Sequence, residues 1–310
     1  MAQPKFIKQD RILIGISLAV LATIVWSGNF IVARKVINDI PPVALAFFRW
    51  LCASIIIAPF AIKSFIAERK ELKLNFSFLF WTALFGVTLF NTFVYVAGHY
   101  SPAINLALIG TTSSPVMSII LAAIFLKERI SIIRILGLTI CIAGIILLLS
   151  QGSWEKLRGF HFSPGDWWIL AAALSFAIYN IFVRRKPASI SPLNFLFLTF
   201  AIGTLLLLPA YIWESRKAAA IHWDWNLLLI ILYLGAGASV LAFLLWNAAI
   251  RRLGAGRTAL FGNLIPIFST MEAVWLLGEE ITAIHIISGL LVIGGLVIAN
   301  LQKTSLAKPS

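Results

Sequence analysis

The sequence predicts an all-α integral membrane protein with ten transmembrane helices, arranged as two inverted five-helix repeats with both termini in the cytoplasm. Three observations lead to this prediction. Of the 310 residues, 60% are apolar and only 12% are charged, whereas a soluble domain carries about a quarter charged residues. Long apolar segments recur along the whole chain, and the mean hydropathy is +0.95. In addition, one apolar segment with an internal proline occurs twice, half a chain length apart.

Ten segments are apolar enough and long enough to cross a bilayer, which requires about 20 largely apolar residues in a helix. No segment alternates in the manner of a barrel strand, and the connections are short. Because continuous helices satisfy their own backbone hydrogen bonds in lipid, a helical bundle follows. The expected spans are residues 12–33, 42–62, 76–98, 102–126, 131–150, 166–186, 192–213, 226–250, 256–277 and 282–302.

The basic residues are divided unevenly between the two sides of the expected membrane. The chain contains 25 Lys and Arg residues and has a formal net charge of +13. Eighteen of these 25 residues fall on the side of the N-terminus, six fall on the opposite side, and Arg49 lies within the second span. Since cytoplasmic loops carry the excess of Lys and Arg, both termini are expected in the cytoplasm. The same rule accounts for the net charge, so no nucleic-acid partner is expected.

The repeated segment relates the two halves of the chain. Pro115 and Glu128 are 13 residues apart, as are Pro266 and Glu279, and the offset between the two copies is 151 residues. Each half contains five expected helices, an odd number, so the second half should enter the membrane in the opposite direction. Transporters built from such inverted repeats bind their substrate near the axis that relates the repeats. The two repeats are expected at residues 1–151 and 152–310.

The order and spacing of these motifs resemble a known family. The run Trp26-Ser27-Gly28-Asn29-Phe30 in the first span and the run Phe47-Phe48-Arg49-Trp50 in the second, together with the repeated proline and glutamate, resemble the EamA family of the drug/metabolite transporter superfamily. The resemblance covers nearly the whole chain. It implies a carrier of metabolites or drugs, most of them exporters, with a central cavity lined by helices 1, 3, 4, 6, 8 and 9. Family members carry amino acids, purines, S-adenosylmethionine, sugar nucleotides or cationic drugs.

Polar and aromatic side chains within these helices are the candidates for substrate binding, because polar groups in lipid are costly unless they face partners or water. Asn29 and Asn180 are equivalent in the repeat. Tyr95 corresponds to Trp246, and two such aromatics can hold a flat substrate group from opposite sides. The alternative is ordinary helix–helix packing and hydrogen bonding. The candidate substrate-binding residues are Trp26, Asn29, Asn91, Tyr95, Thr112, Ser113, Tyr179, Asn180, Trp246 and Asn263.

Two further residues are candidates for coupling transport to protons, namely Glu272 and His99. Glu272 is the one carboxylate well inside an expected span, and the alternative is a hydrogen bond to a polar group on a neighbouring helix. His99 lies near a helix end, where an interfacial role is the alternative. Arg49 is expected to bond carbonyl groups at helix ends, and Glu128 and Glu279 are interpreted as residues of the helix boundaries.

The chain contains no Gly-rich phosphate loop, metal-ligand cluster or nucleophile–base pair, so no catalytic residue, metal or cofactor is expected, and the protein is not expected to be an enzyme. The sequence favours a secondary transporter of the inner (cytoplasmic) membrane that exports a small metabolite, such as an amino acid, or a drug by alternating access. Its expected partners are that substrate, the bilayer and, for coupling, protons; a monomer is expected. The alternatives are uptake or exchange of a nucleotide or S-adenosylmethionine, and a membrane-embedded enzyme or a flippase for lipid-linked substrates.

Overall fold

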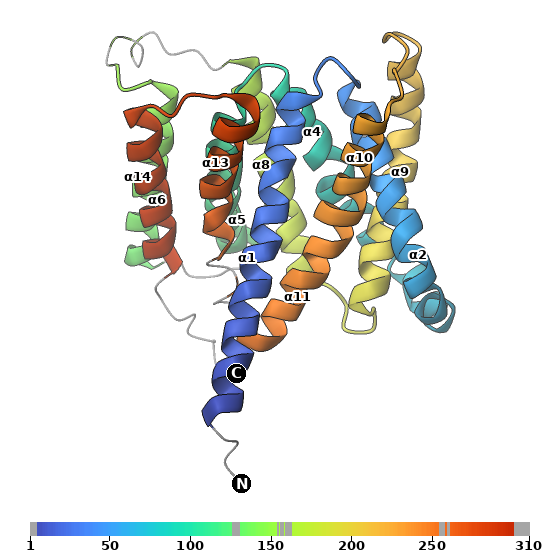
Figure 1. The fold of residues 1–310 in the computed structure, drawn as a ribbon. Coiled ribbons are helices and arrows are strands. Elements are labelled where there is room, and N and C mark those ends of the chain that lie inside the picture. Colours follow the sequence, from blue (N-terminus) through green and yellow to red (C-terminus); the bar gives the residue numbers. More distant parts are fainter. Residues whose placement is uncertain are drawn as a thin grey trace.

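The computed structural model describes residues 5–125, 131–153, 155, 158, 163–253, 258 and 261–300. Every regular element within these ranges is helical (Figure 1). The elements are α1 (Lys5–Lys35), α2 (Pro42–Leu74), α3 (Phe76–Ala83), η1 (Leu84–Leu89), α4 (Phe90–Gly98), α5 (Ala103–Phe125), α6 (Ile132–Leu149), α8 (Pro164–Arg184), α9 (Pro192–Ser215), α10 (Trp225–Leu232), η2 (Tyr233–Leu241), α11 (Ala242–Leu253), η3 (Gly262–Leu264), α13 (Ile265–Leu277) and α14 (Ala283–Asn300).

The apolar helices lie where the hydropathy predicts them. Within the described residues, seven helical segments are long and apolar enough to cross a membrane, and three shorter ones cover Ile135–Leu148, Ile265–Leu277 and Ala283–Ala299. The elements α3, η1 and α4 form one continuous segment, as do α10, η2 and α11. The chain is therefore an all-helical membrane protein, with seven long apolar helices and three shorter ones in the part that the structure describes.

The described part of the ninth apolar helix, Ile265–Leu277, lies within the expected span at residues 256–277, and residues 254–257 and 259–260 lie outside the described residues. The short 3-10 turn η3 precedes α13, and Phe261 on its other side is also helical. Pro266 lies in the first turn of α13, a position at which proline is tolerated in a helix. Pro266 therefore directly follows a short 3-10 interruption of the α-helical geometry.

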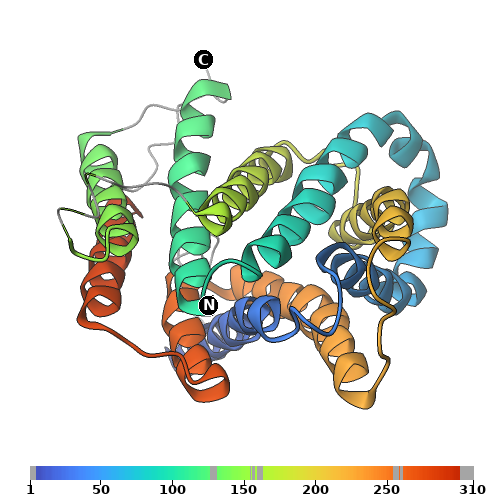
Figure 2. The same ribbon diagram turned by 90° about the horizontal axis from the view of Figure 1, so that it is seen from above.

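The helices stand side by side, and the pairs that pack most closely join one half of the chain to the other. Helix α2 packs against α9 at one side of the bundle, and α6 packs against α14 at the opposite side (Figures 1 and 2). Between them, α1 packs against α11 and α13, and α8 packs against α4 and α5. Helix α1 begins and α14 ends toward the bottom of Figure 1, whereas α6 ends toward the top.

A small apolar cluster lies between α6, α14 and α5; it is formed by Val116 of α5, Leu138 and Cys141 of α6, and Val292 and Leu296 of α14. The backbones of α6 and α14 approach closely, since a β-carbon at Gly137 would lie 2.6 Å from the carbonyl oxygen of Gly295. Small residues allow such packing between membrane helices. The helices from α1 to α5 and from α8 to α13 share the main core, to which α6 contributes Leu148.

Two of the spans contain a π-helical segment, and these segments are repeat-related. The segment η1 covers Leu84–Leu89, and η2 covers Tyr233–Leu241, about 150 residues later. A π-helical turn is wider than an α-helical turn and is common at functional sites. The carbonyl of Ala238 in η2 accepts a hydrogen bond of 2.9 Å from the indole nitrogen of Trp26 in α1. The widened turn thus provides an acceptor for a side chain of another helix.

Candidate substrate-binding site around helix α1

The middle turn of α1, Val25–Asn29, is surrounded by polar groups from several helices. Successive residues of an α-helix point about 100° apart, so this turn faces a different neighbour at each position. Ser27 contacts α13, Trp26 contacts η2, and Asn29 contacts α2 and α4. We call this group the α1 polar belt. Its side chains are Trp26, Ser27, Asn29, Arg49, Tyr95, Tyr233, Ser239, Ser269 and Glu272.

Arg49 is the buried cation of the belt and is only 4% exposed. Its Nε donates to Ser239 Oγ at 3.0 Å, and its Nη1 donates to Tyr95 Oη at 2.8 Å and to Asn29 Oδ1. Tyr95 Oη in turn donates to Asn29 Oδ1 at 3.0 Å. The expectation that Arg49 bonds helix-end carbonyls is therefore wrong, because the acceptors of its hydrogen bonds are side-chain oxygens of Ser239, Tyr95 and Asn29. The guanidinium ties α2 to α1, α4 and η2.

Glu272 lies on the other side of α1 and has one satisfied oxygen. Its Oε1 accepts a hydrogen bond of 2.7 Å from Ser27 Oγ, whereas its Oε2 is buried and has no hydrogen-bond partner among the described residues. Ser269, on the same helix, donates to the Ser27 carbonyl at 3.0 Å. Glu272 thus forms a hydrogen bond to a polar group on a neighbouring helix, which the sequence analysis gives as the alternative to a role in coupling. Its second oxygen is free to bind a proton, a water molecule or a ligand group.

The aromatic residues Trp26 and Tyr95 of the belt make different kinds of contact: Trp26 packs against other rings, and Tyr95 forms hydrogen bonds through its hydroxyl. The Trp26 ring packs against Trp246 at 5.1 Å and against Phe243 at 5.4 Å between ring centroids. Tyr95, which is the repeat equivalent of Trp246, instead directs its hydroxyl at Arg49 and Asn29. The hydroxyl that distinguishes tyrosine from tryptophan gives Tyr95 this different role. The two aromatics belong to different parts of the belt, and their joint action on a substrate stays a prediction.

Three candidates on α4 and α5 differ in how their polar groups are satisfied. Asn91 is 1% exposed, and neither its amide nitrogen nor its amide oxygen has a hydrogen-bond partner within the described ranges. The same holds for the buried Ser113 hydroxyl. Thr112 donates to the Leu108 carbonyl one turn earlier at 2.5 Å, so its helix already satisfies it. Asn91 and Ser113 therefore carry the unused hydrogen-bonding capacity.

Among the candidates of the second half, Asn180 and Tyr179 make none of the belt contacts described above, in contrast to Trp246. The amide of Asn180 donates to Ser118 Oγ on α5 at 3.4 Å, so its partner differs from those of Asn29. Tyr179 is buried, and its ring lies 5.5 Å from the ring of Phe176. Asn263 occupies η3, but its side chain lies outside the described part of the chain. Glu128 also lies outside the described residues.

His99 is placed at the end of the bundle, one residue beyond α4. It is exposed, and the guanidinium of the nearby Arg34 donates to the Gly98 carbonyl at 3.2 Å. Partial burial lowers the pKa of His99, and the positive charge of Arg34 lowers it further. His99 is one turn beyond Tyr95 and makes none of the belt contacts described above.

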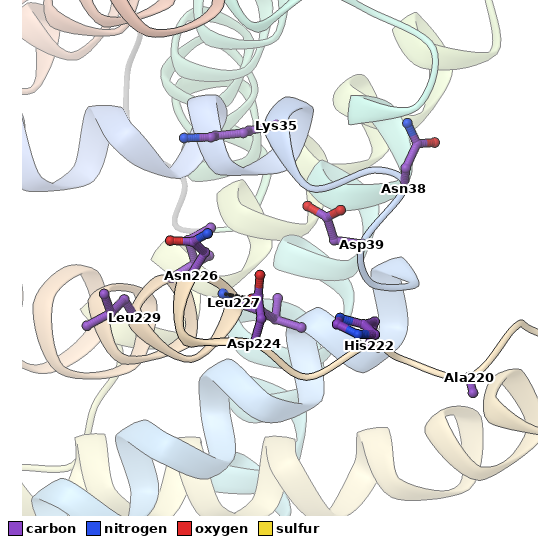
Figure 3. A pocket seen from close by; sticks show the side chains of 10 residues that line it. Lys35, Asn38, Asp39, Ala220, His222, Asp224, Asn226, Leu227 and Leu229 are labelled. Carbon is purple, nitrogen blue, oxygen red and sulfur yellow. Dashed lines mark hydrogen bonds between the residues drawn. The ribbon is translucent and has the colours of Figure 1, made fainter.

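Two hollows lie beside the C-terminal end of α1, about 9 Å along the helix from Asn29 at 1.5 Å per residue. The first has a volume of about 590 Å³ and lies between the α1–α2 turn and the start of α10 (Figure 3). The second, of about 480 Å³, shares Lys35 and Asn38 with it. These hollows are at the bundle end, whereas the sequence predicts a cavity near mid-membrane. The polar residues that line the first are Lys35, Asn38, Asp39, His222, Asp224 and Asn226.

Four belt residues are not among the substrate-binding candidates that the sequence indicates: Ser27, Tyr233, Ser239 and Ser269. For Arg49, the sequence analysis predicts hydrogen bonds to helix-end carbonyls instead of to side chains. The available signal was a hydroxyl or a charge inside an apolar segment, which is too common in membrane helices to select these positions. Their importance follows from contacts between residues about 20 to 250 positions apart along the chain.

Comparison with known proteins agrees with this architecture. A transporter of Bacillus subtilis, "Uncharacterized transporter YyaM", is 27% identical over 93% of this chain and 94% of that protein. A Salmonella typhimurium protein named "Probable amino-acid metabolite efflux pump" is 28% identical over 91% of this chain and 93% of its own length. The Escherichia coli protein of the same name is 25% identical over 91% and 93%.

One solved crystal structure has the same fold, with a TM-score of 0.62 and 18% identity over 94% of this chain and 96% of that one. The model of the EamA-like transporter family matches residues 13–150 and again residues 163–301, so each half of the chain is one copy of the family's unit. The chain therefore belongs to the EamA-like transporter family of the drug/metabolite transporter superfamily, and it is a multi-pass membrane transporter rather than an enzyme.

Proposed function

We propose that this protein is a secondary transporter that exports a small metabolite, an amino acid or a similar molecule, across the inner membrane by alternating access. The α1 polar belt and the adjoining residues of α4 and α5 form its binding site. The observation that carries the proposal is that Asn91, Ser113 and Glu272 each have buried polar atoms with no hydrogen-bond partner in the part of the chain that the structure describes. Such atoms are costly in a membrane interior unless water or a ligand satisfies them.

The proposed topology is two inverted repeats, residues 1–151 and 152–310, with both termini in the cytoplasm. The positions of the helix ends support it, because α1 begins and α14 ends at the same side of the bundle while α6 ends at the other. The packing of α1 on α13, mirrored by that of α8 on α5, also fits a twofold relation. The excess of Lys and Arg on the N-terminal side sets the direction.

An amino acid or a similar molecule suits the chemistry of this site. Asn91 offers a hydrogen-bond donor and an acceptor, Ser113 offers a hydroxyl, and Glu272 offers a carboxylate oxygen that can receive an ammonium group. Trp26 of the belt and Trp246, which packs on it, provide apolar surface. Two relatives are named as amino-acid metabolite efflux pumps, which supports the same substrate class. Glu272 is also the residue that we propose binds the coupling proton, and the proposed working unit is a monomer.

Flux through liposomes containing the purified protein tests this function. Liposomes loaded with unlabelled amino acids should accumulate a labelled amino acid of the same kind by counterflow, for at least one member of a panel of the 20 amino acids. An imposed pH gradient should change the rate if protons are coupled. Asn91→Ala should reduce the flux, whereas Thr112→Ser, at a position already satisfied by its own helix, should not. Counterflow of a nucleotide or of S-adenosylmethionine in place of amino acids would overturn the proposed substrate class.

A further inference from the structure

Tyr233, the first residue of η2, occupies a notch in α1. Its hydroxyl donates a hydrogen bond of 2.5 Å to the carbonyl of Val25. In an α-helix that carbonyl also accepts the amide of the residue four positions later, here Asn29. A β-carbon at position 28 would lie only 2.2 Å from Tyr233 Oη. Gly28 is therefore the residue that lets the tyrosine approach the backbone of α1 next to Asn29.

Tyr233 lies between the two charged residues of the belt. At about 100° per residue, Ser27 and Asn29 point about 200° apart around α1. Glu272, which binds Ser27, and Arg49, which binds Asn29, are consequently on different sides of this helix. Gly28 is halfway between these two positions, and Tyr233 is the side chain seated there.

Ser27, Gly28 and Asn29 are consecutive residues, so Glu272, Tyr233 and Arg49 all contact the same turn of α1. A hydroxyl dipole close to a carboxylate and a guanidinium interacts with both charges, so its energy depends on both. If one charge is lost, the hydroxyl dipole is stabilised less, and the electrostatic stabilisation of the remaining charge changes as well. Such effects are larger in a site from which water is largely excluded than at a wet surface.

We propose that Tyr233 is a positioning residue that couples the charge state of Glu272 to Arg49, so that the two sides of the α1 polar belt respond as one unit. Binding of a proton or of a cationic substrate group to Glu272 is then felt by the Arg49–Asn29–Tyr95 network across α1. The use of this coupling in a transport cycle rests on the proposed function, but the coupling itself is a property of the folded protein.

A set of thermal unfolding measurements on the purified full-length protein in detergent tests the coupling without any substrate. Glu272→Gln, Arg49→Gln and the double variant are compared in the parent and again in a Tyr233→Phe background. In the parent, the double variant should lose less thermal stability than the sum of the two single losses, by about 2 °C or more. In the Tyr233→Phe background, the two losses should become additive. Equal non-additivity in both backgrounds, or additivity already in the parent, overturns the proposal.

The control background is Tyr211→Phe, since Tyr211 in α9 stacks on Phe47 at 4.7 Å between ring centroids and does not belong to the belt. This background should keep the non-additivity of the parent. If Arg49→Gln does not fold, Tyr95→Phe replaces it, because Tyr95 belongs to the same side of the belt. Flux measurements on the same variants stay separate. Absence of amino-acid counterflow contradicts the proposed function, whereas additive unfolding effects contradict the role of Tyr233.

Discussion

The carboxylate of Glu214, in the last turn of α9, accepts a hydrogen bond of 2.8 Å from the amide of Ala44 in the first turn of α2. Its other oxygen accepts from the amide of Val43 at 3.1 Å. The reverse contact is present too, since Glu68 of α2 accepts from the amide of Ser191 at the N-cap of α9 at 2.9 Å. The first amides of a helix have no intrahelical partner and favour a nearby negative charge. Each helix of the pair therefore caps the N-terminus of the other: Glu214 of α9 caps α2, and Glu68 of α2 caps α9.

Glu214→Gln should destabilise the protein, because an amide side chain has one acceptor oxygen for two backbone amides and carries no charge. We expect a loss of about 1 kcal/mol, since the site is half-buried and water screens part of the interaction. The matched control is Glu280→Gln, at an exposed carboxylate near a helix end. Thermal unfolding in detergent measures both. Equal stability of the two variants would show that the contact contributes little.

The aromatic pair of the proposed site makes a second prediction. Trp246→Ala removes the ring that packs on Trp26 and should reduce amino-acid flux about tenfold or more while much of the protein remains folded. Tyr95→Ala opens a cavity at a side chain that is only 1% exposed, so it should cost stability as well as flux. Tyr95→Phe isolates the hydroxyl and should reduce flux with a smaller loss of stability.

The measurement is counterflow per folded protein, with the folded fraction taken from size-exclusion chromatography. Tyr100→Phe, at an exposed position beyond α4, is the control for loss of a tyrosine hydroxyl. Normal flux in both Trp246→Ala and Tyr95→Phe would remove the aromatic residues from the proposed site.

The sequence predicts the spans well, and the repeat correctly indicates that the chain contains two copies of one unit. Both follow from local apolar composition and from spacing along the chain. The π-helical segments were not predicted, because an extra residue per turn leaves no mark in hydropathy. The acceptors of Arg49 and the seat of Tyr233 on Gly28 depend on which faces of distant helices meet. The packing of the helices determines these contacts, so the residue pattern of a single helix does not predict them.

Topology gives a third prediction. A reporter fused after Ser150, which follows five helices, should be detected outside the cytoplasm, and one fused after Ser310 should be detected inside. The physical reason is that loops rich in Lys and Arg are retained in the cytoplasm. Paired alkaline phosphatase and green fluorescent protein fusions measure this. A cytoplasmic signal at both positions would be incompatible with an inverted repeat.

His99 makes a fourth prediction, on pH. Burial and then the charge of Arg34 lower its pKa in the folded protein. The unfolded chain therefore binds more protons at this position, so its contribution to stability is present above the ordinary histidine pKa of about 6.5 and is lost as the pH falls toward the lower folded value. His99→Gln should flatten the decrease of the unfolding temperature between about pH 7 and pH 5. A decrease of the same slope in His99→Gln as in the parent would show that another group causes it.

Glu272→Gln separates a coupling role from a structural one. The variant retains an oxygen that can accept the hydrogen bond from Ser27, and it removes the charge and the titration. We therefore expect the folded yield to remain near that of the parent, while the flux loses its dependence on an imposed pH gradient. Ser27→Ala provides the complementary change, because it breaks the contact between α1 and α13 and keeps the carboxylate; its flux should fall but still respond to the gradient. If Glu272→Gln retains both the parental rate and the parental pH dependence, the residue serves only to hold α13 against α1, and coupling by this carboxylate is excluded.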